Sequence, residues 1–419
     1  MIFPYFPKYT ANMPIVDIHT HIYPPSYVDL LRSRTTVPYV RNFDDAPESS
    51  RLIILPGEDD PSTPSTSRGR PIGPEYYDIK QKIAFMDQHK IDKSVISLAN
   101  PWLDFLPSDE AGAAARKIND DVDAICAGYP GRLYAFGTLP LSADAATIVQ
   151  EVERLSTLKH MRGVIMGTSG LGNGLDDAAL DPVWAAIEKA GQMIFLHPHY
   201  GLPKEVYGPR GSEYGHVLPL ALGFPLETTI AVTRMLLSGV WDRFTRLNVL
   251  LAHSGGTLPF LAGRIESCIL HDGHLKKAGT RDNRRKIWDI LKTNVYLDAV
   301  IYSEVGLGAA VEASGADRLL FGMCIWLGER KCDLLITFRD GPSFLPAAGG
   351  GRRGVAQRER KLHGDIEGFW GRRAGEGGPW WQRRAYTEVG RVGYTHEIRA
   401  RNVIAIAVTL GTSSRAAGL

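Results

Sequence analysis

Hydrophobic residues in this chain gather in short runs, and longer segments with a helical spacing of apolar positions separate them. Eight of these runs, between residues 15 and 322, have the length and composition of buried β-strands. They are residues 15–18, 93–98, 133–139, 163–167, 193–197, 248–253, 294–298 and 318–322. Eight strands that alternate with helices over about 300 residues predict an α/β fold of the (β/α)8 TIM-barrel type.

Two of the intervening segments carry clear helix signals. The first runs from Asp181, expected as the N-cap, to Gly191, expected as the stop, and the second spans residues 76–88. An open, doubly wound sheet is the competing fold. No glycine-rich phosphate-binding fingerprint follows the first predicted strand, and this favours the barrel.

Residues 41–74 differ from the rest of the predicted barrel because they are polar and rich in proline. They follow the first predicted strand and are too polar to form barrel wall. One interpretation is a mobile surface insertion. The other is a lid that closes over the site and lends Arg68 or Arg70 to an anionic substrate.

Polar residues cluster where the predicted strands end, the edge at which barrel enzymes carry out their chemistry. His19 and His21 are two residues apart on an extended backbone, so their side chains point to the same side. Strands five and six also end in histidine. This recurrence predicts one shared metal site, with zinc preferred and other divalent ions possible. The polar strand-end residues are His19, His21, Asn100, His197, His253 and Asp298. Four further histidines are interpreted as ordinary polar residues: His199, His216, His271 and His274.

Several segments resemble the metal-dependent decarboxylases of the amidohydrolase superfamily, a group that includes aminocarboxymuconate-semialdehyde decarboxylase. These segments are 17–21 (DIHTH), 197–199 (HPH), 252–256 (AHSGG) and 259–264 (PFLAGR). A narrower resemblance, to the fungal uracil-5-carboxylate (isoorotate) decarboxylases, rests on 97–105 (SLANPWLDF), 167–172 (GTSGLG), 207–210 (YGPR) and 222–225 (LGFP). The similarity extends over residues 14–322.

This resemblance implies a zinc ion held by His19, His21, His197 and an aspartate after strand eight. It implies substrate contacts from Asn100, Phe224 and His253, with Asn100 and His253 taking part in catalysis. Arg264 is expected to act across the interface of a homodimer or homotetramer.

The implied reaction is the non-oxidative decarboxylation of a small cyclic unsaturated carboxylic acid, with uracil-5-carboxylate giving uracil and CO2. Alternatives are aminocarboxymuconate semialdehyde or a hydroxybenzoate as substrate, or a metal-dependent hydrolase.

The chain departs from the family at the end of strand eight. The family has Phe-Gly-Thr-Asp-His-Pro there, and its aspartate is both a metal ligand and the proposed proton donor. This chain carries Cys324 at the ligand position. A thiolate can bind zinc, but a thiol is a poor substitute for a carboxylic proton donor. We therefore expect weak or absent activity, and a non-catalytic protein is the rival hypothesis.

Composition also changes after this point, because the tail is rich in glycine, arginine and paired tryptophan and lacks periodicity. Our hypothesis is a translated intron. Codons for Gly322, Met323 and Cys324 can contain the splice donor GTATGT, and Arg339 can supply the acceptor AG. Removing the intervening stretch shifts the reading frame. Residues from Asp340 onward, back-translated in that frame, can give Thr-Asp-His-Pro-Phe-Phe-Pro-Pro-Leu, which restores the missing family residues.

Bulk properties limit the other possibilities. A net charge of +2 over 419 residues gives no case for a nucleic-acid or membrane partner. The spacing of the four cysteines fits neither a zinc finger nor a disulfide framework, which favours a cytoplasmic protein. No apolar run is long enough to span a bilayer. The predicted organisation is an N-terminal extension at 1–13, the barrel domain at 14–322 and an aberrant, disordered tail at 323–419.

Overall fold

The computed structural model describes residues 14–323, apart from residues 45, 63, 66–67 and 278–283. Cys324 and the tail that follows it lie outside the described residues, so the predictions made for them stay predictions.

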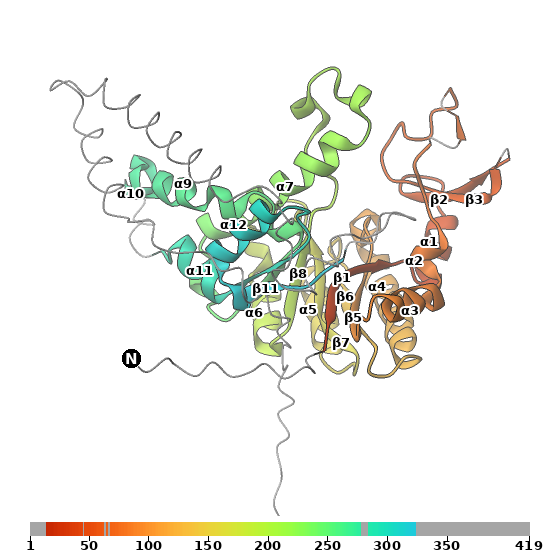
Figure 1. The fold of residues 1–419 in the computed structure, drawn as a ribbon, viewed down its shortest axis with the longest axis horizontal. Coiled ribbons are helices and arrows are strands. Elements are labelled where there is room, and N and C mark those ends of the chain that lie inside the picture. Colours follow the sequence, from red (N-terminus) through yellow and green to blue (C-terminus); the bar gives the residue numbers. More distant parts are fainter. Residues whose placement is uncertain (1–13, 45, 63, 66–67, 278–283, 324–419) are drawn as a thin grey trace, which may run out of the picture. The chain divides into compact units, whose positions relative to one another are not determined.

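The eight predicted strands form one parallel sheet in sequence order, with helices between them (Figure 1). This is the (β/α)8 barrel that the hydrophobic pattern predicts. The barrel strands are β1 (Val16–Ile22), β5 (Lys93–Leu98), β6 (Leu133–Thr138), β7 (Met161–Gly167), β8 (Met193–His197), β9 (Asn248–Leu251), β10 (Val295–Asp298) and β11 (Leu319–Leu320). The two-residue β11 is the shortest of them, and it ends at the point where the sequence departs from the family.

The first and last strands meet through three contacts that close the barrel. The backbone N–H of Ile18 donates to the carbonyl of Phe321 at 3.1 Å. The N–H of Met323 donates to the Asp17 carboxylate at 3.0 Å. Gly322 permits the close approach, because a Cβ atom at this position would lie 2.8 Å from Cβ of His19. The closure therefore places the residues that follow β11, the eighth barrel strand, directly against β1, which carries His19 and His21.

Helices fill the intervals between the strands. They are α1 (Pro25–Arg32), α2 (Pro74–Tyr77), α3 (Ile79–Gln88), α4 (Ser108–Ala127), α5 (Ala145–Leu155), α6 (Asp181–Ala190), α7 (Phe224–Leu237), α8 (Val240–Arg243), α9 (Leu258–His271), α10 (Gly273–Lys277), α11 (Ile287–Thr293) and α12 (Glu304–Ser314).

Both helices predicted in detail are present, with corrected boundaries. Asp181 is the first helical residue of α6 rather than its N-cap, which is Leu180, and Gly191 ends the helix in the left-handed conformation, as expected. The predicted helix at 76–88 is two helices. Asp78 separates them, because its side chain accepts a hydrogen bond from the N–H of Lys80 and caps α3.

The polar insertion after β1 is a small antiparallel sheet rather than an irregular loop. Its strands are β2 (Tyr39–Phe43), β3 (Ala46–Ile53) and β4 (Arg70–Pro71). Leu52 and Ile53 on β3 are fully buried, so a few apolar residues at the edges of the polar stretch give this sheet its core. In Figure 1 the insertion and the segment between β8 and α7 both extend beyond the barrel, toward the top of the view.

One helical stretch, Pro219–Leu237, is long and apolar enough to cross a membrane by length and composition alone, with a mean hydropathy of 1.3. This is an exception to the expectation that no such run exists. It is weak support for a membrane span, because helices that pack on a barrel pass the same test. Val232 and Leu236 of this stretch are buried in the protein core.

Candidate metal centre and active site

Three histidines from two different strands converge inside the end of the barrel. His19 and His21 lie on β1, and His197 is the last residue of β8. The ring centroids of the three imidazoles lie 5.0 to 5.2 Å apart, in edge-to-face orientation. The distance between Nε2 of His19 and Nε2 of His21 is 3.1 Å. The structure thus brings together the three histidines that the sequence predicts as metal ligands.

Each of the three imidazoles has a hydrogen-bond partner at its other ring nitrogen, Nδ1. For His19 the partner is the Asp298 carboxylate at 2.6 Å. For His21 it is the Ser97 hydroxyl at 3.0 Å, and for His197 it is the Pro198 carbonyl at 2.7 Å. Carboxylate and carbonyl oxygens only accept, so Nδ1 of His19 and of His197 carries the proton. The Ser97 hydroxyl donates to the carbonyl of Thr20, and it therefore accepts from Nδ1 of His21.

In the neutral imidazoles these partners leave the lone pair on Nε2. The Nε2 atoms of His19 and His21 lie 3.1 Å apart, and two such nitrogens can both coordinate one cation. Metal-binding histidines commonly donate their second ring N–H to a carboxylate or a carbonyl, as His19 and His197 do here. The donor set therefore fits a divalent metal bound through three Nε2 atoms.

Burial sets the protonation state of this cluster. Loss of hydration lowers the pKa of His21 and of His197 well below the ordinary histidine value, and the neighbouring histidines lower it further. Both rings are neutral at physiological pH, which is the form that binds metals.

Asp298, at the end of β10, organises the cluster from behind. Besides His19, its carboxylate accepts from the backbone N–H groups of His253 at 3.0 Å, Ser254 at 2.7 Å and Val300 at 3.1 Å. Burial alone would raise the pKa of Asp298, but the hydrogen bond and charge of His19, the charge of His253 and the bond from the Ser254 N–H outweigh it, and the pKa is lowered. The sequence analysis names Asp298 only as a polar residue at a strand end and gives it no role. Its position at the end of a buried strand is the feature that marks it in the sequence.

His253 lies between the histidine cluster and an aromatic ring. Its ring centroid is 5.0 Å from that of His197 and 5.3 Å from that of His19. Phe224, the first residue of α7, lies 6.3 Å away and nearly parallel to it. Nδ1 of His253 is buried without a hydrogen-bond partner among the described residues. This nitrogen is therefore available to a ligand. Potential ligand atoms of His19, His197 and His253 also lie within 4.8 Å of one another, so His253 is within coordinating range as well.

Asn100 lies beside the cluster and is held by the polar insertion. Its side-chain N–H donates to the carbonyl of His199 at 2.7 Å. Arg70, on β4, donates to the backbone carbonyl of Asn100 at 2.7 Å and to its side-chain oxygen at 3.2 Å. Nε of Arg70 is buried without a partner among the described residues. Of the two arginines weighed from sequence, Arg70 reaches the site.

Arg68, the other arginine considered from the sequence, makes its contacts within the insertion. Its guanidinium donates to the carbonyl of Pro61 and lies 3.7 Å from the Asp59 carboxylate.

Two predicted participants are not part of this cluster. Arg264 is exposed on α9 of the described chain, which is compatible with the predicted role across a subunit interface but does not test it. Cys324, at the expected fourth ligand position, lies outside the described residues. Of the histidines interpreted as ordinary polar residues, His216, His271 and His274 are exposed, whereas His199 is 2% exposed and contacts Trp102. His199 is therefore a buried polar residue of the segment after β8.

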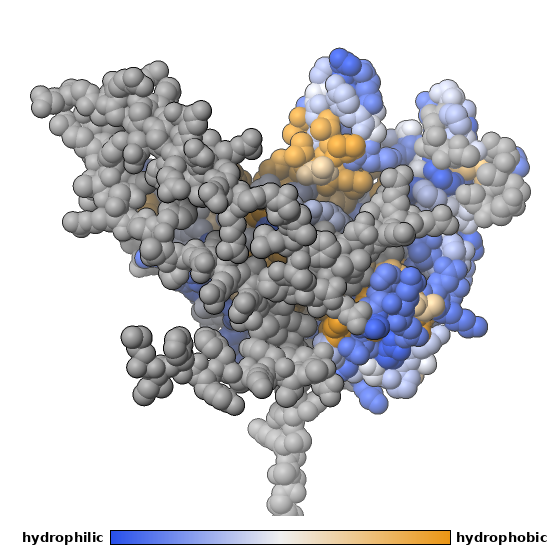
Figure 2. Space-filling view, viewed as in Figure 1, coloured by the Kyte–Doolittle hydropathy of each residue, from blue (hydrophilic) through white to orange (hydrophobic). Residues whose placement is uncertain are grey.

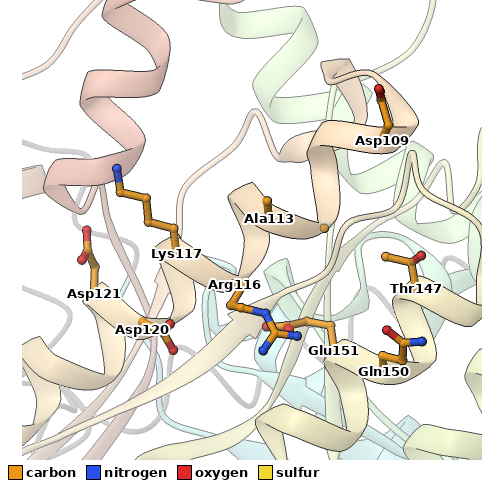
Figure 3. A pocket seen from close by; sticks show the side chains of 10 residues that line it. Asp109, Ala113, Arg116, Lys117, Asp120, Asp121, Thr147, Gln150 and Glu151 are labelled. Atoms are coloured by element: carbon orange, nitrogen blue, oxygen red, sulfur yellow. The ribbon is translucent and has the colours of Figure 1, made fainter.

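A separate surface groove of about 590 Å³ runs between α4 and α5 (Figure 3). It is lined by charged residues, and Arg116 extends toward Glu151 in the figure. No histidine of the cluster lines this groove, so it is distinct from the candidate metal centre.

Comparison with known proteins decides the family. The Amidohydrolase family model matches residues 16–323, which is most of the chain. The chain belongs to this family. The crystal structure of the IDCase (isoorotate decarboxylase) of Metarhizium anisopliae in apo form is 58% identical, with a TM-score of 0.71, and the match covers 74% of this chain and 84% of that one. The resemblance to the isoorotate decarboxylases is therefore confirmed.

Two more distant family relatives widen the comparison. The 2-amino-3-carboxymuconate-6-semialdehyde decarboxylase of Dictyostelium discoideum is 28% identical, and the match covers 60% of this chain and 66% of the relative. A dihydroxybenzoic acid decarboxylase of Polaromonas, solved with bound manganese, is 22% identical with a TM-score of 0.57, over 77% of this chain and 89% of that one. At this identity the second comparison shows the shared fold.

Proposed function

We propose that the protein is a metal-dependent carboxy-lyase that converts uracil-5-carboxylate to uracil and CO2 without an oxidant. The observation that carries the proposal is the convergence of the imidazole rings of His19, His21 and His197, with the phenyl ring of Phe224 6.4 Å from that of His197. The 58% identity to an isoorotate decarboxylase supports this substrate over the others.

The residues around the centre suit a flat anionic ring. A divalent metal held by His19, His21 and His197 would neutralise the negative charge of the substrate carboxylate. Phe224 offers an apolar face to the ring. Nδ1 of His253 and the amide of Asn100 can hydrogen-bond to ring carbonyl and N–H groups. The Arg70 guanidinium, which hydrogen-bonds to Asn100, would add positive charge near the substrate carboxylate.

The reaction also needs a proton. The bond between C5 and the carboxyl carbon breaks, CO2 leaves, and a proton takes its place on C5. In the family this proton is assigned to the aspartate that follows the eighth barrel strand, which is β11 here. This chain has Cys324 at that position. We propose that the chain as written turns over slowly or not at all, because general-acid catalysis typically contributes about 10²- to 10⁴-fold.

Other substrates and a non-catalytic role are the alternatives. An aminocarboxymuconate semialdehyde or a hydroxybenzoate would place its carboxylate at the same centre, and a metal-dependent hydrolase would use the centre to activate water. A non-catalytic protein would keep the barrel without the proton donor. The stacking surface of Phe224 favours a planar ring.

We infer zinc as the metal, because three imidazoles leave an open position of the kind found in catalytic zinc sites. The same nitrogens accept other divalent ions, including manganese. We also infer a cytoplasmic location, since neither charge nor cysteine spacing indicates export.

We further propose a homodimer or homotetramer. Phe260 on α9 is 84% exposed and lies one turn before Arg264, so the two side chains share a face. Apolar residues also gather on the surface of α7 and the segment before it, in the orange region of Figure 2. Leu220, Leu222 and Ile230 are the large exposed side chains there. An exposed apolar surface of this kind is typical of subunit interfaces.

The function is tested with two proteins, the chain as written and a form whose reading frame is restored after Gly322. Each is loaded with zinc and incubated with uracil-5-carboxylate, and uracil is quantified by chromatography. We expect uracil from the restored form and little or none from the chain as written. No uracil from the restored form, together with turnover of 2,6-dihydroxybenzoate, would replace the proposed substrate.

A further inference from the structure

Glu227 connects several parts of the candidate site that lie on different elements. It belongs to the first turn of α7, one turn after Phe224. An acidic residue in the first turn of a helix ordinarily faces solvent and interacts with the helix dipole. The Glu227 side chain instead turns toward the loop that follows β8.

The Glu227 carboxylate accepts hydrogen bonds from two other elements. Oε1 accepts from the backbone N–H of His199 at 2.7 Å and from the hydroxyl of Thr168, the residue after β7. Oε2 accepts from the backbone N–H of Gly201 at 2.6 Å. Bonds between N–H groups and an ionised carboxylate are among the stronger ones in proteins. One side chain therefore fixes the path of residues 199–201 and ties it to α7.

The anchored loop holds other residues of the site. The carbonyl of His199 accepts from the side chain of Asn100 at 2.7 Å, so the orientation of that amide depends on the loop. His197 is two residues before His199 and ends β8. A Cβ atom at Gly201 would lie 3.7 Å from the Phe224 ring, which shows how closely the loop approaches it.

We propose that Glu227 is a positioning residue that fixes Asn100 and Phe224 relative to the His197 ligand, and thereby sets the width of the space for the substrate ring. The part of this inference that concerns the ring rests on the proposed function. The anchoring of the loop does not.

The experiment compares the zinc-loaded chain with Glu227→Gln and with Glu205→Gln. Glu205 is an exposed residue of the segment between β8 and α7, which also contains His199 and Gly201. Glu205→Gln changes the net charge by the same amount as Glu227→Gln. Hydrogen–deuterium exchange of residues 199–201 is measured first, without any substrate. We expect faster exchange at His199 and Gly201 in Glu227→Gln, with the amides of β8 unchanged. Unaltered exchange at these two positions would overturn the anchoring.

The affinity for uracil-5-carboxylate is then measured by calorimetry. We expect Glu227→Gln to weaken it by at least about 10-fold, the lower end of the effect of removing a supporting contact. The zinc affinity should change less than the ligand affinity, and Glu205→Gln should match the parent protein. Faster exchange with an unchanged ligand affinity would overturn the positioning role. A parent chain that does not bind uracil-5-carboxylate would count against the proposed function, and the exchange measurement would then decide the anchoring alone.

Discussion

Nε2 of His19 lies 3.1 Å from Nε2 of His21, and Nδ1 of each ring is bonded to another residue, Asp298 for His19 and Ser97 for His21. In the neutral rings the two Nε2 lone pairs then lie close enough together to coordinate one cation. The metal centre is thus implied by the hydrogen bonds at Nδ1 as much as by the nearness of the rings.

Asp298→Asn should weaken zinc binding by about 10- to 100-fold, the effect expected when the partner of a metal-binding histidine is removed. The charged acceptor of the His19 N–H is lost, which makes the ring a weaker donor to the metal. Zinc affinity is measured by competition with a chromophoric chelator. Asp289→Asn, an exposed aspartate on α11, is the control. Equal affinities in the two variants would show that Asp298 does not support the centre.

Arg70→Ala should weaken binding of uracil-5-carboxylate by about 10- to 100-fold, which corresponds to hydrogen bonds with a charged group. Arg68→Ala should change it little, because Arg68 bonds within the insertion. Calorimetry on the zinc-loaded variants separates the two. If both substitutions weakened binding equally, Arg70 would have no specific role in binding, and the insertion would contribute only through its folded structure.

Asp104→Asn should remove a contribution to stability that is largest at low pH. Burial raises the pKa of Asp104 to about 6, whereas its unfolded value is near 3.8. A raised carboxyl pKa favours the folded state at low pH, and this contribution is lost as the pH rises from about 4 through 6. His199 lies 3.5 Å from Asp104 but offers it no positive charge, because burial lowers the pKa of His199 to about 3 and the ring is neutral.

The measurement is urea unfolding of the metal-free protein between pH 4.5 and 8. The buried neutral histidines change the stability with pH equally in all variants, so the difference between parent and variant is compared. The unfolding free energy of the parent minus that of Asp104→Asn should fall by about 2 kcal/mol as the pH rises across this interval. Asp317→Asn, whose side chain is 75% exposed, should show no such change relative to the parent. A difference between the parent and Asp104→Asn that stays constant with pH would contradict the assignment.

The transcript across codons 322–340 should lack the stretch between Gly322 and Arg339 in its main form. The shifted frame then encodes the Thr-Asp-His-Pro sequence of the family. Sequencing of complementary DNA checks this directly, and a main transcript that retains the stretch would rule out a translated intron.

The sequence predicted the barrel well because each strand is an apolar run of strand length with a clear end. It also predicted the histidine cluster, since the ends of parallel strands meet at one edge of a barrel. It could not choose between Arg68 and Arg70, because that choice depends on the register of the β3–β4 pair. Nor could it find Glu227, because two of its partners are backbone N–H groups, which no residue type reveals.

The most direct test of the central claim is zinc K-edge X-ray absorption of the purified chain, combined with metal analysis. We predict one zinc per chain with three imidazole nitrogens at about 2.0 to 2.1 Å. His21→Ala should remove one imidazole from this shell. It should lower the zinc affinity by about 100-fold, because one of the ligands that together supply the binding free energy of zinc is lost. A chain that binds no stoichiometric metal, or binds it equally well after His21→Ala, would contradict the account.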